Sequence, residues 1–263
     1  MRKLYIGTNT KMYKTIAQTR SFLQELRERT ADLDRRVLEL FVIPSFTALE
    51  TAGSVVQDCA IRLGAQNMAW EDEGQLTGEI SPVMLEEVGV TIAEIGHSER
   101  RHILGETDEL LNRKVRAAHR HGLTALLCIG ETEVQKEHGI ANEVLRIQLK
   151  EGLHGVAPEA APLIWIAYEP VWAIGTSGKP ASAAYAEEKH RVIHDTLQEL
   201  FGTAAQDIPV LYGGSVNAGN AAGLIGMPHV DGLFIGRSAW EADRFTEIIR
   251  SVLPVFQQKR CEA

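Results

Sequence analysis

The sequence predicts an α/β protein folded as a single closed (β/α)8 barrel. Eight short apolar runs alternate with segments of helical spacing along the 263 residues. Several of these runs are nearly continuous in hydrophobicity, as parallel strands buried on both faces are. No linker rich in Pro, Ser or Gly divides the chain. Such an alternation favours a closed barrel over an open sheet, and α/β barrels reach this length as one unit. We therefore expect one domain over residues 1–263.

The expected strands follow one another along the whole chain. They lie at 4–8, 38–43, 61–65, 91–95, 123–129, 163–168, 208–212 and 232–235. Between them, apolar side chains recur at the three- and four-residue spacing of one helix face. The spacing is clearest at Phe22, Leu23 and Leu26, and again at Phe245, Ile248, Ile249 and Val252. Three helix starts carry capping residues, which are Thr47 with Glu50, Ser81 before Pro82, and Thr132 with Gln135.

The composition favours a globular protein and argues against a nucleic-acid-binding one. Apolar residues make up 44% and charged residues 24% of the chain, as in a globular protein with a large core. With 27 Lys and Arg against 35 Asp and Glu, the net charge is -8, so a broad surface for nucleic acid is not expected. A small anion can still be bound by backbone N–H groups at helix starts or glycine turns.

Cysteines and apolar segments indicate the compartment. Cys59, Cys128 and Cys261 are odd in number and lack metal-ligand spacing, so neither a disulfide framework nor a zinc cluster is expected. The first residues are not expected to form a signal peptide, and no run approaches the roughly 20 apolar residues that span a bilayer. We expect a soluble cytoplasmic protein without membrane contact.

Polar side chains follow several of the expected strands. Asn9 and Lys11 follow the first strand, His97 the fourth and Glu169 the sixth. In a (β/α)8 barrel these strand ends meet on one face, where active sites are built. Taken singly, each residue has an ordinary explanation as a surface lysine, a structural histidine or a rim carboxylate. Their coincidence favours a proton-transfer site with Glu169, beside a loop that could close over it, as the base.

Glycine turns follow the last two expected strands, at Gly213-Gly214-Ser215 and at Gly236-Arg237. Each could be an ordinary strand-to-helix turn. Barrels, however, commonly build a phosphate site at these two places from backbone N–H groups.

We expect Glu99, with Arg100 and Glu106, to form an ion network around the site; a direct role of Glu99 in proton transfer is the less favoured alternative.

Six blocks carry most of these residues. They are Asn9-x-Lys11-Met12, Ala65-Gln66-Asn67 with Thr77-Gly78-Glu79, 94–101, 128–132, 168–176 and 212–216. Together they resemble the triosephosphate isomerase family, whose fold is the TIM barrel, over essentially the whole chain. The resemblance implies an isomerase that requires neither metal nor organic cofactor. Glu169 would remove a proton beside the substrate carbonyl, and Lys11 and His97, helped by Asn9, would stabilise the enediolate oxygens.

The same resemblance implies how the substrate is held and covered. Its phosphate would lie on the backbone N–H groups of Gly175, Ser215, Gly236 and Arg237. Residues 170–181 would form a lid, in which Ile174 helps to exclude water from the enediolate. Thr77 of one subunit would lie near the partner's site, so the resemblance also implies a homodimer.

Four features depart from the family's usual pattern. They are Thr10 in place of a Trp, a lid one residue longer near Ser177, Arg237 in place of a Gly, and the unusual loop 68–74. All belong to the substrate cavity, the lid or the dimer contact. The N–H of Arg237 can serve only where the backbone tolerates a side chain, and its guanidinium would then add charge near the phosphate. The alternative is that Arg237 points outward into solvent.

Segments 66–70 and 232–240 are similar to one branch of the family, the L-erythrulose-1-phosphate isomerases. This similarity implies conversion of L-erythrulose 1-phosphate to D-erythrulose 4-phosphate, as in erythritol catabolism. The alternative is triosephosphate isomerase activity, the glycolytic interconversion of dihydroxyacetone phosphate and D-glyceraldehyde 3-phosphate. A barrel that binds phosphorylated ligands without turnover is less favoured, because binding needs no base. A barrel aldolase or epimerase would need a Schiff-base lysine or a metal site.

Overall fold

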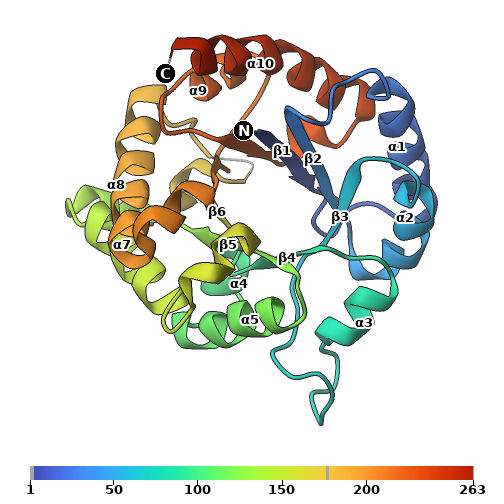
Figure 1. Cartoon of the computed structure of the whole chain (residues 1–263), viewed down its shortest axis with the longest axis horizontal. Helices are drawn as coiled ribbons and strands as arrows, with labels where there is room; N and C mark the ends of the chain where they lie inside the picture. The colour runs from blue at the N-terminus through green and yellow to red at the C-terminus, as the bar shows by residue number, and fades with distance from the viewer. Residues whose placement is uncertain (1–2, 176–177, 263) are drawn as a thin grey trace.

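The computed structural model describes residues 3–175 and 178–262, and it has the predicted closed barrel of parallel strands (Figure 1). The strands are β1 (Leu4–Asn9), β2 (Leu38–Ile43), β3 (Ile61–Ala65), β4 (Ile92–Ile95), β5 (Thr124–Ile129), β6 (Ile164–Tyr168), β7 (Val210–Tyr212) and β8 (Gly232–Ile235). They pair in sequence order, and β8 closes the ring on β1 through pairs such as Tyr5 with Gly232. The carboxyl ends of all strands therefore lie on one face.

Helices surround the barrel and cover the outer side of its strands (Figure 1). They are α1 (Ile16–Arg29), α2 (Leu49–Val56), α3 (Pro82–Glu87), α4 (Ser98–His102), α5 (Asp108–Arg120), α6 (Glu133–Glu137), α7 (Ala141–Gly152), α8 (Ala183–Phe201), α9 (Ala221–Ile225) and α10 (Ala242–Glu262). Short 3-10 turns join some of them, at Phe46–Ala48, Pro158–Leu163, Val171–Ala173, Gly202–Asp207 and Arg237–Ala239.

Two apolar regions hold these layers together. The larger lies between strands and helices and includes the predicted helix faces, such as Phe22 on α1 and Phe245 on α10. The smaller fills the inside of the barrel with side chains such as Phe41, Trp165 and Phe234. Because the barrel interior is packed rather than open, a ligand can enter only at the ends of the strands.

The predicted strands agree with the structure to within two residues at each end. The predicted caps agree at Ser81, which accepts a hydrogen bond from the N–H of Met84, and at Thr132, which forms a complete capping box with Gln135. The cap predicted at Thr47 is wrong. A 3-10 turn occupies Phe46–Ala48, so Thr47 lies inside it and α2 begins only at Leu49.

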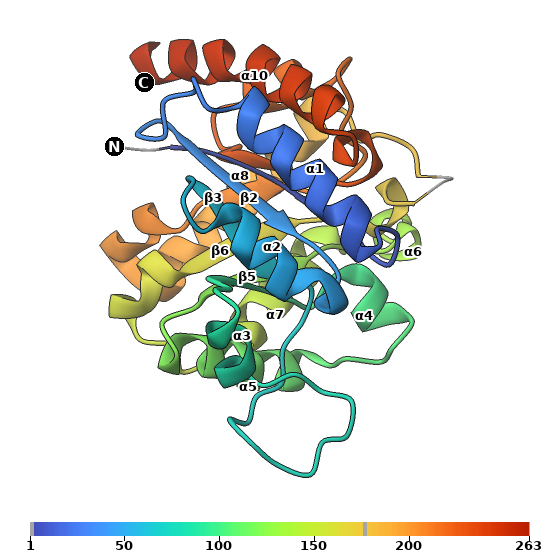
Figure 2. The same ribbon diagram turned by 90° about the vertical axis from the view of Figure 1, so that its right-hand side faces the viewer.

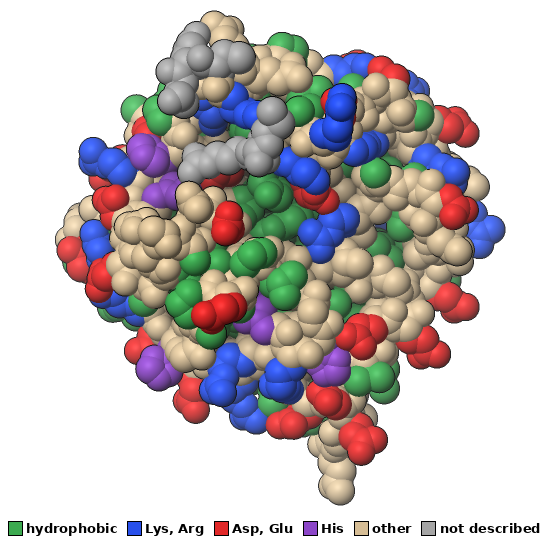
Figure 3. All heavy atoms as spheres, viewed as in Figure 1, with side chains coloured by type: hydrophobic (Ala, Val, Ile, Leu, Met, Phe, Trp, Pro, Cys, Tyr) green, Lys and Arg blue, Asp and Glu red, His purple; other side chains and the backbone are tan. Residues whose placement is uncertain are grey.

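The loop between β3 and α3 extends away from the barrel (Figure 2). On the face of the molecule in Figure 3, acidic and basic side chains are intermixed rather than gathered into a broad patch of one sign. Among the described helices, none combines the length and apolar character needed to cross a membrane.

Candidate active site

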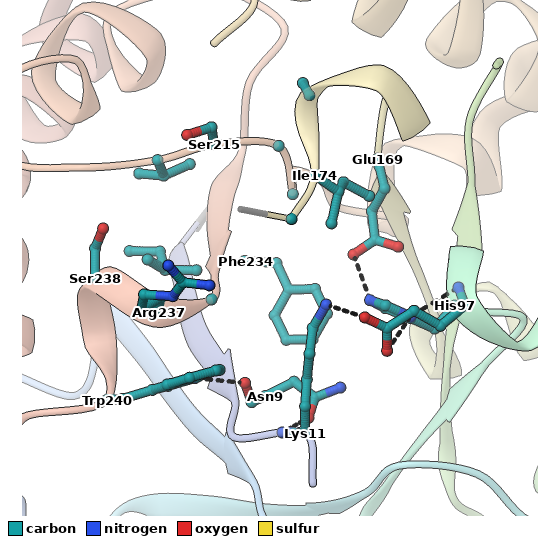
Figure 4. A pocket seen from close by; sticks show the side chains of 18 of the residues that line it. Asn9, Lys11, His97, Glu169, Ile174, Ser215, Phe234, Arg237, Ser238 and Trp240 are labelled. Carbon is teal, nitrogen blue, oxygen red and sulfur yellow. Dashed lines mark hydrogen bonds and ion pairs between the residues drawn. The ribbon is translucent and has the colours of Figure 1, made fainter. Parts of the chain in front are cut away.

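A pocket of about 210 Å3 opens at the carboxyl ends of the strands (Figure 4). Ten of the eleven residues predicted from the sequence line it, which are Asn9, Lys11, His97, Glu99, Glu169, Ile174, Gly175, Ser215, Gly236 and Arg237. They come from β1, β4, β6, β7 and β8 or from the loops after these strands. The barrel thus brings together residues as far apart in the sequence as Asn9 and Arg237.

Asn9 and Lys11 are held in a tight turn after β1. The Asn9 side-chain oxygen Oδ1 accepts hydrogen bonds from the Lys11 backbone N–H at 2.6 Å and from Gln66 Nε2 at 3.0 Å. Gln66 Nε2 also donates to the Lys11 carbonyl oxygen at 2.8 Å. Lys11 has a φ of 51°, a left-handed conformation that costs a non-glycine residue energy and persists only where neighbours hold it. These bonds place the Lys11 side chain at the pocket.

His97 is oriented by the start of α4. The chain reaches it through Gly96, whose φ of 76° is one that a glycine adopts without penalty. His97 Nδ1 accepts a hydrogen bond from the Glu99 backbone N–H at 3.2 Å, so Nδ1 carries no proton. The neutral imidazole therefore bears its proton on Nε2, which lies 3.7 Å from Glu169 Oε1.

Glu169 follows the last residue of β6 and is only 4% exposed. Its backbone N–H donates to the Ile129 carbonyl oxygen at 2.7 Å, which ties the residue to the neighbouring strand. Within the described part of the chain, its Oε2 has no hydrogen-bond partner. A buried carboxylate with a free oxygen, next to a histidine that can donate, is equipped to take a proton from a bound molecule.

Charged residues around the pocket form two ion-pair groups rather than the single network expected. Glu99 Oε1 pairs with Lys11 Nζ at 2.6 Å, within the pocket. Arg100 instead pairs with Glu106, which also binds the buried Lys114 at 2.5 Å. Glu99 is therefore part of the pocket lining, while Arg100 and Glu106 belong to the supporting structure beside it.

At the end of the pocket opposite Glu99 and Glu169, none of the described lining residues is acidic. Ser215, Ser238 and Arg237 face it from the loops after β7 and β8 (Figure 4). Arg237 begins a 3-10 turn, and its φ is not positive, so its backbone tolerates a side chain there. The guanidinium lies at the pocket and makes no ion pair with any residue that the structure describes, which favours an anion at this end.

Comparison with known proteins places this site in a family. The sequence model of triosephosphate isomerase matches residues 4–252. The chain belongs to the triosephosphate isomerase family. The L-erythrulose-1-phosphate isomerase of Rhizobium etli is 49% identical over 251 residues, covering 95% of this chain and 92% of that protein. The protein of the same name from Rhizobium meliloti is 46% identical over 252 residues, covering 95% and 96%.

A solved structure is similar as well. The crystal structure of triosephosphate isomerase from Bartonella henselae matches with a TM-score of 0.85 and 35% sequence identity, covering 95% of this chain and 98% of that one. These matches place the chain among the sugar-phosphate isomerases.

The first part of the expected lid is anchored beneath by a buried carboxyl group. Glu131 Oε1 accepts hydrogen bonds from Trp172 Nε1 and from the Tyr185 hydroxyl, both at 2.8 Å. The Tyr168 hydroxyl also donates to Glu131, at 3.1 and 3.2 Å. Ile174 and Gly175 then reach the pocket. The lid-tip residues Thr176 and Ser177 lie outside the described residues.

Thr77 is exposed on the loop between β3 and α3 and does not line the pocket of the described chain. Several pocket residues had no predicted role, including Tyr13, Phe234 and Trp240, whose indole N–H donates to the Asn9 carbonyl oxygen at 2.9 Å. Glu94, which contacts Asn9 beneath the pocket, was also missed. Its signal was a lone acidic residue inside the apolar run 91–95.

Proposed function

We propose that this chain converts L-erythrulose 1-phosphate to D-erythrulose 4-phosphate by proton transfer through an enediolate, as a step of erythritol catabolism. The observation that carries the proposal is the set of relatives, 46–49% identical over about 95% of the chain, that are named L-erythrulose-1-phosphate isomerase. The geometry supports the chemistry, since the pocket joins a buried base to a neutral imidazole and a lysine at one end and, at the other, an arginine that has no ion pair among the described residues.

Glu169 takes the proton from C3 of the substrate. The electron pair of that C–H bond forms the double bond between C2 and C3, and negative charge develops on the C2 oxygen. Lys11 Nζ and the His97 Nε2 proton stabilise this charge, and Asn9 holds the Lys11 turn in place. A proton moves from the C3 oxygen to the C2 oxygen, Glu169 returns its proton to C2, and the carbonyl is left on C3. This division of roles is the one for which triosephosphate isomerase is the usual example.

The phosphate binds at the other end of the pocket. Backbone N–H groups of Gly175, Ser215, Gly236 and Arg237 donate to its oxygens, and the Arg237 side chain adds a fixed positive charge. Ile174 covers the reacting carbons and excludes water. Neither a metal ion nor an organic cofactor takes part in these steps.

Triosephosphate isomerase activity is the second candidate, favoured by the family model and by the structural match. The chemistry is the same, and L-erythrulose 1-phosphate differs from dihydroxyacetone phosphate by one hydroxymethyl group on the carbon that Glu169 deprotonates. Comparing kcat/KM for L-erythrulose 1-phosphate and for D-glyceraldehyde 3-phosphate decides between them. We expect the tetrulose to be preferred at least tenfold, and a preference for the triose would overturn the substrate assignment.

The role of Glu169 is tested separately. Glu169→Gln keeps the shape of the side chain and removes the base, so kcat is expected to fall by about 10² to 10⁴-fold, with a smaller change in KM. Unchanged turnover in this variant would exclude Glu169 as the base, whichever sugar phosphate is the substrate.

We further propose that the chain forms a homodimer in the cytoplasm. Met12, next to Lys11, is 93% exposed, and it borders a recess lined by Tyr13 and Phe46. The projecting loop that carries Thr77 is the segment of a second copy suited to cover this apolar surface (Figure 2). The free thiols of Cys59 and Cys128 suit a reducing compartment.

Sedimentation analysis of wild-type protein and Met12→Asp tests the dimer. We expect a dimer that the substitution turns into monomers. Val134→Asp is the matched control, because Val134 is also exposed, at 57%, but lies on α6 away from this recess. A wild-type monomer, or a Met12→Asp dimer, would contradict the proposed contact.

A further inference from the structure

A carboxyl group is buried directly beneath the pocket. Glu94 belongs to β4 and is 0% exposed. Around it, the barrel interior is filled by apolar side chains such as Ile43, Ile92 and Leu126. Burying a carboxylate among such groups is costly unless it is paired or neutral. An isoleucine or leucine would fill this position at no such cost, so the carboxyl group calls for an explanation beyond packing.

The contacts of Glu94 lead to the substrate end of the pocket. Its Oε2 accepts a hydrogen bond from Asn9 Nδ2 at 2.7 Å. The Cys128 thiol lies 3.9 Å from its Oε1. One oxygen of Glu94, the sulfur of Cys128 and one oxygen of Glu169 all lie within 4.8 Å of one another. Glu94 therefore touches one polar residue of the pocket and is close to the base.

The environment of Glu94 favours the neutral form of its carboxyl group. Burial raises its pKa well above the ordinary carboxyl value, and the charges of Glu169 and Glu99 add to the rise. The hydrogen bond from Asn9 and the charge of Lys11 act in the opposite direction. Burial also raises the pKa of the neighbouring Cys128 thiol. Because carboxyl and thiol groups must lose their protons to bind a metal ion, this trio is better suited to hydrogen bonding.

Asn9 depends on Glu94 for its orientation. The Asn9 Oδ1 is occupied by the Lys11 backbone N–H and by Gln66, and Glu94 receives the Nδ2 group. With both ends of the amide bound, Asn9 cannot rotate. The left-handed turn that presents Lys11 rests on the same amide. Loss of the acceptor at position 94 would leave the buried Nδ2 unpaired and free the amide to turn.

We propose that Glu94 is a positioning residue of this isomerase: its carboxyl group fixes the Asn9 amide and, through that amide, the turn that presents Lys11. This inference rests on the proposed isomerase activity. It adds a residue that does not touch the substrate and acts through Asn9 and Lys11, which line the pocket.

Steady-state kinetics of Glu94→Gln and Glu94→Leu test the positioning role. Glutamine offers Asn9 the same acceptor oxygen, so we expect kcat/KM to fall by less than about threefold. Leucine fills the space but accepts no hydrogen bond, so kcat is expected to fall about 10- to 100-fold with little change in KM. Thermal denaturation of both variants shows whether each is folded at the assay temperature, which keeps the kinetic comparison interpretable.

Wild-type kcat in Glu94→Leu, or an equal loss in Glu94→Gln and Glu94→Leu, would overturn the positioning role. The kinetics use whichever of the two sugar phosphates the wild-type enzyme turns over, so a wrong substrate assignment does not affect the result. The neutral state is tested without activity. The infrared difference spectrum between wild-type protein and Glu94→Gln at pH 7 should contain the carbonyl stretch of a protonated carboxylic acid, and its absence would contradict the raised pKa of Glu94.

Discussion

Replacing Gly213 by alanine should disable the enzyme by displacing its base. A Cβ at position 213 would lie 2.8 Å from Cγ and 3.2 Å from Oε1 of Glu169. Carbon atoms in contact are normally about 3.5–4.0 Å apart, so the new Cβ and Glu169 Cγ would overlap by about 1 Å. The Gly213 backbone cannot retreat easily, because its N–H donates to the Tyr168 carbonyl oxygen at 2.8 Å. Its φ is not positive, so alanine causes no backbone strain of its own. The Glu169 side chain must therefore move.

Displacing a catalytic group by about 1 Å lowers the rate on the order of 10²-fold, which corresponds to about 2.7 kcal/mol in the activation free energy. We expect Gly213→Ala to lower kcat by about this factor, measured on the preferred sugar phosphate. Gly223→Ala is the matched control, because Gly223 lies on α9 with no atom within 4 Å of its added Cβ. It should retain wild-type kinetics. If folded Gly213→Ala keeps kcat within threefold of wild type, the claim that Gly213 positions Glu169 as the base is wrong.

Three further predictions concern charge. Glu94 has a raised pKa in the folded protein, so its contribution to stability is complete below the ordinary carboxyl pKa and is lost as pH rises towards the raised value. In urea titrations, the unfolding free energy of Glu94→Gln should therefore gain on that of wild type as the pH rises above the ordinary carboxyl pKa, with a limiting slope of about 1.4 kcal/mol per pH unit, and a constant difference would refute this. Lys114→Met removes a buried partner of Glu106, so it should lower the unfolding free energy by about 3 kcal/mol in the same assay. A loss below about 0.5 kcal/mol would mean that Arg100 alone compensates the charge of Glu106. Arg237→Gln should raise KM about fivefold at low salt, with Arg237→Lys intermediate, because an exposed guanidinium contributes only part of a charge-assisted bond; an unchanged KM would place the side chain outside the phosphate site.

The position of each strand along the chain could be predicted from the sequence because it depends on a local run of apolar residues. The runs 38–43, 61–65 and 232–235 agree with β2, β3 and β8 residue for residue, since the burial of both faces requires a continuous apolar stretch. Residues placed at strand ends, such as His97 and Glu169, could be predicted to meet because a closed parallel barrel has all its carboxyl ends on one face. Thr47 was mispredicted because a 3-10 turn and a helix start share the same local residues.

Contacts across the barrel required the tertiary structure. The bond between Asn9 and Glu94 joins residues 85 positions apart, and no local pattern pairs an amide of β1 with an acid of β4. The same holds for the close approach of Gly213 to Glu169. The sequence by itself therefore determined the barrel, the family and the set of reactive groups, because these depend on local hydrophobicity and on motifs. Only the closed barrel decided that Glu94 is buried, with a raised pKa, and that both ends of the Asn9 amide are hydrogen-bonded, because burial and long-range hydrogen bonds arise when distant strands pack together.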